Sequence, residues 1–189
     1  LEEVLTIFEE VHRVTPIDDR RWVINHVLQA SPQQLQRINK LGLVVETIPL
    51  TELWLRGSKF VDQPDLADSA VSHRRYGDMG VEYAFGTDNK PYSPFATLWA
   101  AVARTERGTG TVLGPEQRLS RMDALRAFTM GGAYFCFEED RRGSIEVGKL
   151  ADMAVLSDDL LQMPEGYIPD LNSVLILVGG EVTHQTTDF

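Results

Sequence analysis

Two side chains suited to metal binding or proton transfer stand at the ends of apolar runs in this chain. His26 lies in the apolar run at 22–28, and Asp88 follows the run at 81–85 after Gly86-Thr87. Imidazole nitrogen and carboxylate oxygen are suitable ligands for zinc or a similar divalent metal, and a carboxylate beside an activated water can serve as general base. Taken singly, a hydrogen-bonded core histidine and an Asx turn or helix cap are the simpler explanations.

The apolar runs around these residues predict strands, and a helix follows each of them. Both runs are rich in β-forming residues. Ser31-Pro32 and Ser93-Pro94 then provide an N-cap and a first-turn residue for helices with a periodic apolar face. Between them the sequence predicts a second strand at 43–48, a long loop at 49–65 and a helix at 66–79. Strands that alternate with helices favour a parallel sheet of βα units, in which active sites lie where strands end.

The number of strands limits the architecture. Three core strands are visible, whereas an eight-stranded barrel takes about 250 residues. The α/β chain of 189 residues is therefore expected to be the second half of a (β/α)8 barrel. A doubly wound sheet is the rival, but no glycine-rich phosphate turn follows a strand. The chain opens inside a helix without an initiator methionine, and we expect a longer polypeptide to cover the apolar stripe Leu1, Val4, Leu5, Phe8 and Val11.

The last part of the sequence changes from helices to strands. A helix that starts at Ser120 is followed by short strands, two of which flank a pair of glycines and predict a hairpin. These strands are expected at 153–156, 174–178 and 181–184. We therefore divide the chain into a partial barrel at 1–142 and a small carboxy-terminal β appendage at 143–189.

The composition excludes several classes of partner. The net charge of −10, with no basic cluster to offset it, argues against a nucleic-acid surface and against an anionic membrane. No apolar run reaches membrane-spanning length. The single cysteine, Cys136, rules out an internal disulfide and fits a reducing compartment, so we expect a cytoplasmic protein. Cys136 is flanked by aromatic residues and is expected to pack within a helix.

Four segments that occur in a fixed order resemble one protein family. They are Ile24–Val27, Gly86–Asn89, Ala124–Thr129 and Gly143–Leu156, the last of which reads GSIEVGKLADMAVL. Together they resemble the carboxy-terminal half of the amidohydrolase superfamily, most closely its amidohydrolase-3 branch. The resemblance implies a metal-dependent (β/α)8 barrel with a small β-sandwich made from both chain ends. It also implies hydrolysis of a non-peptide C–N bond in a small-molecule substrate by metal-activated water.

The resemblance gives roles to both candidate residues. His26 matches the metal-ligand histidine at the end of the fifth barrel strand. Asp88 matches the aspartate at the end of the eighth strand, which holds metal or water and carries the catalytic proton. The implied cofactor is a divalent metal, zinc, in the intact parent protein. Because the family's ligands on the first and fourth strands would precede Leu1, we expect the isolated chain to be metal-poor and inactive.

Ile48 departs from the family pattern, because relatives often carry a histidine at the end of the sixth strand. The Glu46 side chain is expected on the same face of the strand as Ile48, where it is either an oxygen ligand of the metal or a buried or partnered glutamate. His73 lies among arginines and is expected on a solvated helix face. Ile48 favours a second interpretation, in which the chain is a non-catalytic fragment or degenerate homologue that serves as an assembly or binding module. Unpaired sheet edges further predict a homo-oligomer or association with a missing amino-terminal half.

Overall fold

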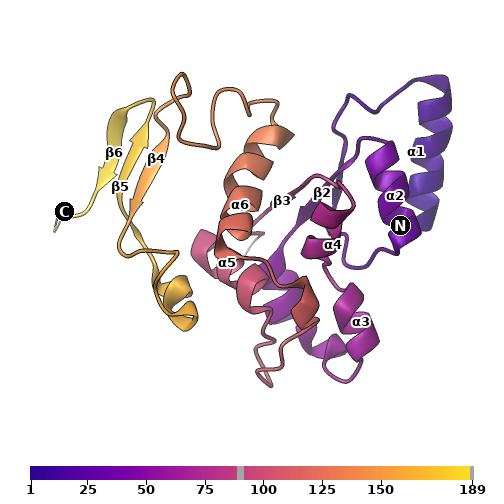
Figure 1. The fold of residues 1–189 in the computed structure, drawn as a ribbon, viewed down its shortest axis with the longest axis horizontal. Coiled ribbons are helices and arrows are strands. Elements are labelled where there is room, and N and C mark those ends of the chain that lie inside the picture. Colours follow the sequence, from indigo (N-terminus) through magenta and orange to yellow (C-terminus); the bar gives the residue numbers. More distant parts are fainter. Residues whose placement is uncertain (89–91, 188–189) are drawn as a thin grey trace.

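The computed structural model describes residues 1–88 and 92–187, which contain two separate three-stranded sheets (Figure 1). The first sheet is parallel and has the order β1 (Val23–Asn25), β2 (Val44–Thr47) and β3 (Tyr83–Phe85). The second is antiparallel and has the order β4 (Met153–Leu156), β5 (Ser173–Val178) and β6 (Glu181–Gln185). The expected parallel strands and the expected carboxy-terminal hairpin are both confirmed.

Helices separate the strands of the first sheet and link it to the second (Figure 1). The α-helices are α1 (Glu2–Val14), α2 (Pro32–Lys40), α3 (Pro64–Ser69), α4 (His73–Asp78), α5 (Pro94–Ala103) and α6 (Arg121–Phe135). The π-helix is η1 (Leu50–Leu55), and the 3-10 helices are η2 (Gly57–Phe60), η3 (Pro115–Gln117) and η4 (Glu165–Asp170). None of the helices in the described ranges is long and apolar enough to cross a membrane.

Three serines begin helices as the sequence predicts. The Ser31 hydroxyl accepts a hydrogen bond from the N–H of Gln34, whose side chain accepts one from the Ser31 N–H. The Ser93 hydroxyl accepts from the N–H of Ala96, and the Ser120 hydroxyl accepts from the N–H of Asp123. Each cap satisfies an N–H group that the first helical turn leaves unpaired, which fixes where these helices start.

The apolar stripe of α1 packs against the chain's own core. Leu5 is completely buried, and Leu1, Phe8 and Val11 pack against the cluster formed by α2 and the first sheet. Val4 is 42% exposed and is the most exposed member of the stripe. The chain's own core therefore covers Leu5 fully and Leu1, Phe8 and Val11 in part, which is more than the sequence led us to expect.

The segment at 49–65, predicted as a loop, is instead largely helical. It contains the π-helix η1 and the 3-10 helix η2. Leu53 and Phe60 from these helices are buried in a small core with Ala70. Buried backbone N–H and C=O groups need hydrogen-bond partners. The helical turns of η1 and η2 provide these partners next to the buried side chains.

The helix predicted at 66–79 is broken into α3 and α4. The break lies at Val71, whose φ of 46° is left-handed and therefore incompatible with a continuous α-helix. The Val71 N–H donates to the carbonyl of Leu28, and its carbonyl accepts from the Arg104 guanidinium. Both partners are distant in sequence, which explains why the local pattern did not show the break.

Two adjacent glycines of α6 give a test of how closely this helix packs on β3. A Cβ at Gly131 would lie 2.5 Å from the carbonyl oxygen of Tyr83, whereas a Cβ at Gly132 would have no neighbour within 4 Å. We expect Gly131→Ala to lower the free energy of unfolding by about 1–3 kcal/mol through overpacking. Gly132→Ala should raise it by about 1 kcal/mol, because alanine has the higher helix propensity. Urea unfolding of both variants checks this, and equal shifts would contradict the packing shown.

Candidate metal centre at the carboxyl ends of the strands

The structure brings His26 and Asp88 to the same end of the first sheet. His26 directly follows β1, and Asp88 follows β3 by three residues. Both strands run parallel, so both residues leave the sheet at its carboxyl edge. Both have left-handed backbones, with φ of 57° at His26 and 54° at Asp88. Histidine and aspartate adopt this conformation more readily than most residues, and it turns the chain sharply as each strand ends.

The π-helix η1 contacts both candidate residues through two adjacent side chains. Glu52 Oε1 lies 3.2 Å from His26 Nδ1. The Thr51 hydroxyl donates a long hydrogen bond of 3.4 Å to Asp88 Oδ2. A π-helical segment of this kind is rare and is often found at functional sites. Sequence reasoning missed η1, although a glutamate inside the apolar run IPLTELWL was a signal that could have found it.

Glu52 is a buried carboxylate with two partners. It is 4% exposed, and its Oε2 accepts a hydrogen bond from the Ile48 N–H at 3.1 Å. Burial raises the pKa of Glu52, while the hydrogen bonds from Ile48 and His26 favour its ionised form. An ionised Glu52 accepts from the Nδ1–H of His26, and this tautomer leaves Nε2 with a free lone pair. The imidazole side chain is 48% exposed and is therefore open to a ligand.

The side chains of Glu46 in β2 and of Ile48, which directly follows β2, lie on one side, as the strand alternation predicts. A Cβ at Gly86 would overlap Glu46 Oε1 and would lie 3.5 Å from Ile48 Cγ1. Glu46 is half-buried, and its charge raises the pKa of Glu52. Glycine at position 86 therefore makes room for the Glu46 carboxylate beside the site.

The residues that the structure describes offer an incomplete donor set for a catalytic metal. In the described ranges, no group of three or more histidine, cysteine, aspartate or glutamate side chains is placed to hold a metal ion. His26 and Asp88 are chemically suitable ligands, but catalytic zinc sites usually use three protein ligands. The two residues alone therefore do not make up such a set, and further donors would be needed to complete it.

His73 and Cys136 differ from expectation. His73 is completely buried, with Nε2 2.8 Å from the Thr47 hydroxyl and its ring stacked on Tyr83. Burial lowers the pKa of His73 well below its ordinary value, so the ring is neutral. It is not on a solvated face, because the break at Val71 turns the first residue of α4 toward the sheet. Cys136 is exposed at the end of α6 and does not pack within it.

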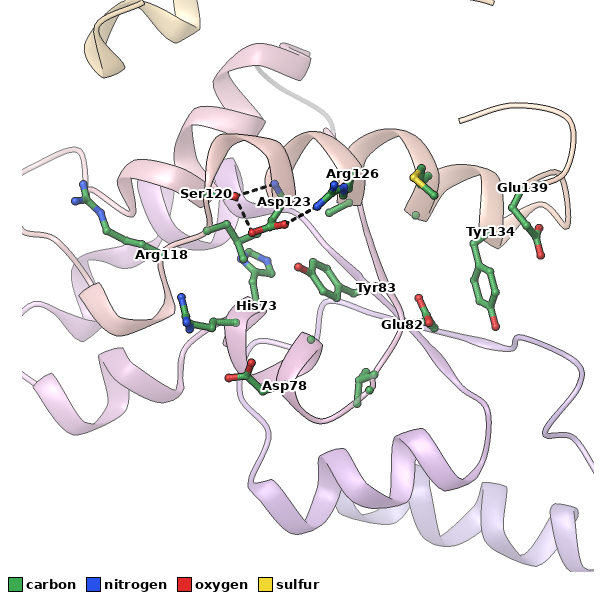
Figure 2. Close-up of a pocket in the computed structure, with 18 residues that line it drawn as sticks. His73, Asp78, Glu82, Tyr83, Arg118, Ser120, Asp123, Arg126, Tyr134 and Glu139 are labelled. Carbon is green, nitrogen blue, oxygen red and sulfur yellow. Dashed lines mark hydrogen bonds and ion pairs between the residues drawn. The ribbon is translucent and has the colours of Figure 1, made fainter. Parts of the chain in front are cut away.

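Figure 2 shows the residues that line a cavity of about 640 Å³. It borders the start of β3 at Val81–Tyr83, whereas Asp88 follows the end of that strand. Among the groups around it, Asp123 accepts one hydrogen bond from the Ser120 hydroxyl and one from Arg126, as Figure 2 shows. Neither His26 nor Asp88 lines this cavity, so its size alone does not make it the site of chemistry.

The direct pairing of β2 with β3 changes the strand numbers that the resemblance implied. In a barrel built of consecutive βα units, the sixth strand has the seventh as its neighbour and not the eighth. Among the described residues, no strand lies between β2 and β3. The assignment of β1, β2 and β3 as the fifth, sixth and eighth strands of the barrel is therefore wrong.

Sequence comparison relates almost the whole chain to known enzymes. A model of the Amidohydrolase family matches residues 1–184. The N-substituted formamide deformylase of Arthrobacter pascens is 29% identical over 197 residues, covering 99% of this chain and 35% of the relative. An imidazolonepropionase of Bacteroides thetaiotaomicron is 28% identical over 159 residues, covering 82% of this chain and 33% of the relative. The chain thus spans about a third of the length of these curated relatives.

Solved structures share the fold. An uncharacterized metal-dependent hydrolase from Pyrococcus horikoshii has a TM-score of 0.71 at 25% identity, covering 87% of this chain and 34% of that one. A zinc-bound adenosine deaminase from Xanthomonas campestris has a TM-score of 0.67 at 20% identity, covering 94% of this chain and 40% of that one. The chain therefore has the fold of part of a (β/α)8 barrel. With the family model matched from residue 1 to residue 184, the chain belongs to the amidohydrolase family.

Proposed function

We propose that this chain is the carboxy-terminal part of a metal-dependent amidohydrolase that hydrolyses a non-peptide C–N bond of a small molecule. The observation that carries the proposal is the placement of His26 and Asp88 at one end of a parallel sheet, each contacted by η1. The chain's coverage of about a third of its relatives supports a preceding polypeptide that supplies the rest of the barrel. We also propose that the chain associates either with that preceding part or with other copies of itself. The same proposal includes a cytoplasmic location.

A corrected strand count supports an active enzyme. If Asp88 ends the eighth strand, the pairing order places β2 as the seventh and β1 as the sixth. His26 then stands at the end of the sixth strand, where the family resemblance expects a histidine. Ile48 ends the seventh strand, for which the resemblance implies no ligand, so it no longer indicates a lost metal site. The ligands of the first, fourth and fifth strands would then come from the preceding polypeptide.

The roles of the side chains follow from their geometry. A zinc ion, when bound, would activate a water molecule for attack on the substrate carbon. His26 would offer Nε2 as a ligand, since Glu52 engages Nδ1. Asp88 would accept the proton of the attacking water and return it to the leaving nitrogen. The Thr51 hydroxyl orients the Asp88 carboxylate through its hydrogen bond to Oδ2.

The alternative is a non-catalytic module, and the incomplete donor set of the described residues favours it. Metal content separates the two proposals. We expect the 189-residue chain alone to hold far less than one divalent ion per chain. The full natural polypeptide should hold at least one, measured by elemental analysis after gel filtration. A metal-free full polypeptide with no activity on amides would favour the binding module instead.

A further inference from the structure

Arg104 is a buried cation whose partners are backbone carbonyls. It ends α5 in a left-handed conformation and is 0% exposed. Its Nε donates to the Leu113 carbonyl at 2.5 Å, Nη1 to the Val71 carbonyl at 2.9 Å and Nη2 to the Ala70 carbonyl at 2.7 Å. Within the described ranges, no carboxylate accepts a hydrogen bond from it. Burial lowers the pKa of Arg104 to about 10, so the group stays charged at neutral pH.

Two of these carbonyls form the junction between α3 and α4, which is strained. Val71 has a φ of 46°, and a β-branched residue in the left-handed region is an outlier that only surrounding contacts can maintain. The planar fork of a guanidinium binds the successive carbonyls of Ala70 and Val71 at once, which a lysine ammonium cannot do in the same fixed geometry.

The same junction holds the segment that leaves β1 after His26. The Val71 N–H donates to the Leu28 carbonyl at 2.9 Å, and Ala70 forms an isolated antiparallel bridge with Gln29. On the other side, the N–H of His26 itself donates to the Glu46 carbonyl at 3.0 Å. The left-handed turn at His26 is thus fixed before it by the sheet and after it by the Ala70–Val71 junction.

From this chain of contacts we propose that Arg104 is a positioning residue for His26. It acts through the Ala70–Val71 junction, which fixes the backbone at 28–29 and so the direction in which the imidazole of His26 leaves the strand. Arg104 itself touches neither His26 nor the site. The structural part of this proposal stands on hydrogen bonds alone, and its consequence for metal binding rests on the proposed function.

Backbone amide exchange in the full natural polypeptide tests the structural part. Arg104→Met removes the fork at similar volume, and we expect exchange at 26–29 and 69–72 to become at least tenfold faster. Exchange in β4 to β6 should stay unchanged. Arg121→Met is the matched control, because Arg121 also donates to a backbone carbonyl, that of Leu160, outside this network. Equal exchange in all segments, or a uniform increase across the whole protein, would overturn the proposal.

Two further measurements keep the proposal decisive. Arg104→Lys keeps the charge and part of the hydrogen bonding, so it should fold and show a smaller increase confined to the same segments. If Arg104→Met fails to fold, unaltered exchange at 26–29 in Arg104→Lys would overturn the proposal. Zinc affinity by chelator competition should fall about tenfold in Arg104→Met, as for other residues that act behind a metal ligand. If the wild-type protein has no zinc affinity, the proposed function is wrong, but the exchange experiment still tests the structural part of the proposal.

Discussion

Asp88→Asn is expected to lower kcat/KM of the full natural polypeptide by about 10²- to 10⁴-fold, the usual contribution of a positioned general acid or base. Asparagine cannot accept the proton of the attacking water at neutral pH. The substitution is otherwise mild, since asparagine also tolerates the left-handed φ of 54° found at this position. Its amide oxygen can still accept the hydrogen bond that the Thr51 hydroxyl donates. The melting temperature should therefore stay close to that of the wild type.

The control for this variant is Asp78→Asn. Asp78 is exposed at the end of α4 and lines the cavity at the opposite end of β3. Its loss of charge should change kcat/KM less than twofold, measured with an amide or formamide substrate that the wild type turns over. If Asp88→Asn retains activity within tenfold of the wild type, Asp88 does not carry the proton and the proposed role is wrong.

Features set by neighbouring residues could be predicted from the sequence. Ser31, Ser93 and Ser120 begin helices because their hydroxyls reach an N–H three residues ahead, a contact that local sequence determines. The hairpin of β5 and β6 likewise follows from its two glycines, both of which have positive φ. The positions of His26 and Asp88 at one edge also followed from strand order, because parallel strands end together.

Features set by distant residues could not be predicted in this way. His73 looked solvated beside two arginines, but its burial depends on the Thr47 hydroxyl and on Tyr83. The break at Val71 depends on carbonyl contacts with Arg104, 33 residues away. The barrel-strand numbers were wrong for the same reason. Hydrogen bonds between distant segments make β3 the neighbour of β2, and the order of motifs along the sequence does not show this. In each case the deciding partner lies outside any local sequence window.

Glu52→Gln is expected to lower the zinc affinity of the full natural polypeptide by about 10- to 100-fold, the range found when a partner of a metal-binding histidine is removed. Glu52 as a carboxylate accepts from both the Ile48 N–H and the His26 Nδ1–H. A glutamine has one acceptor and one donor end, so it cannot accept from both. If its NH2 faces His26, the proton moves to Nε2 and blocks the proposed ligand atom. If its NH2 faces the Ile48 N–H instead, two donors oppose each other.

The effect should appear in metal binding and not in the stability of the metal-free protein. A glutamine of equal size can keep its amide oxygen on the Ile48 N–H and its NH2 on His26, so that orientation costs little folding free energy. Glu106→Gln is the matched control: Glu106 is also buried and also accepts backbone hydrogen bonds, from Gly108 and Thr109. Chelator competition should show near wild-type zinc affinity for Glu106→Gln. Equal affinities in both variants would mean that Glu52 does not set the tautomer of His26, and that η1 contacts the site without orienting it.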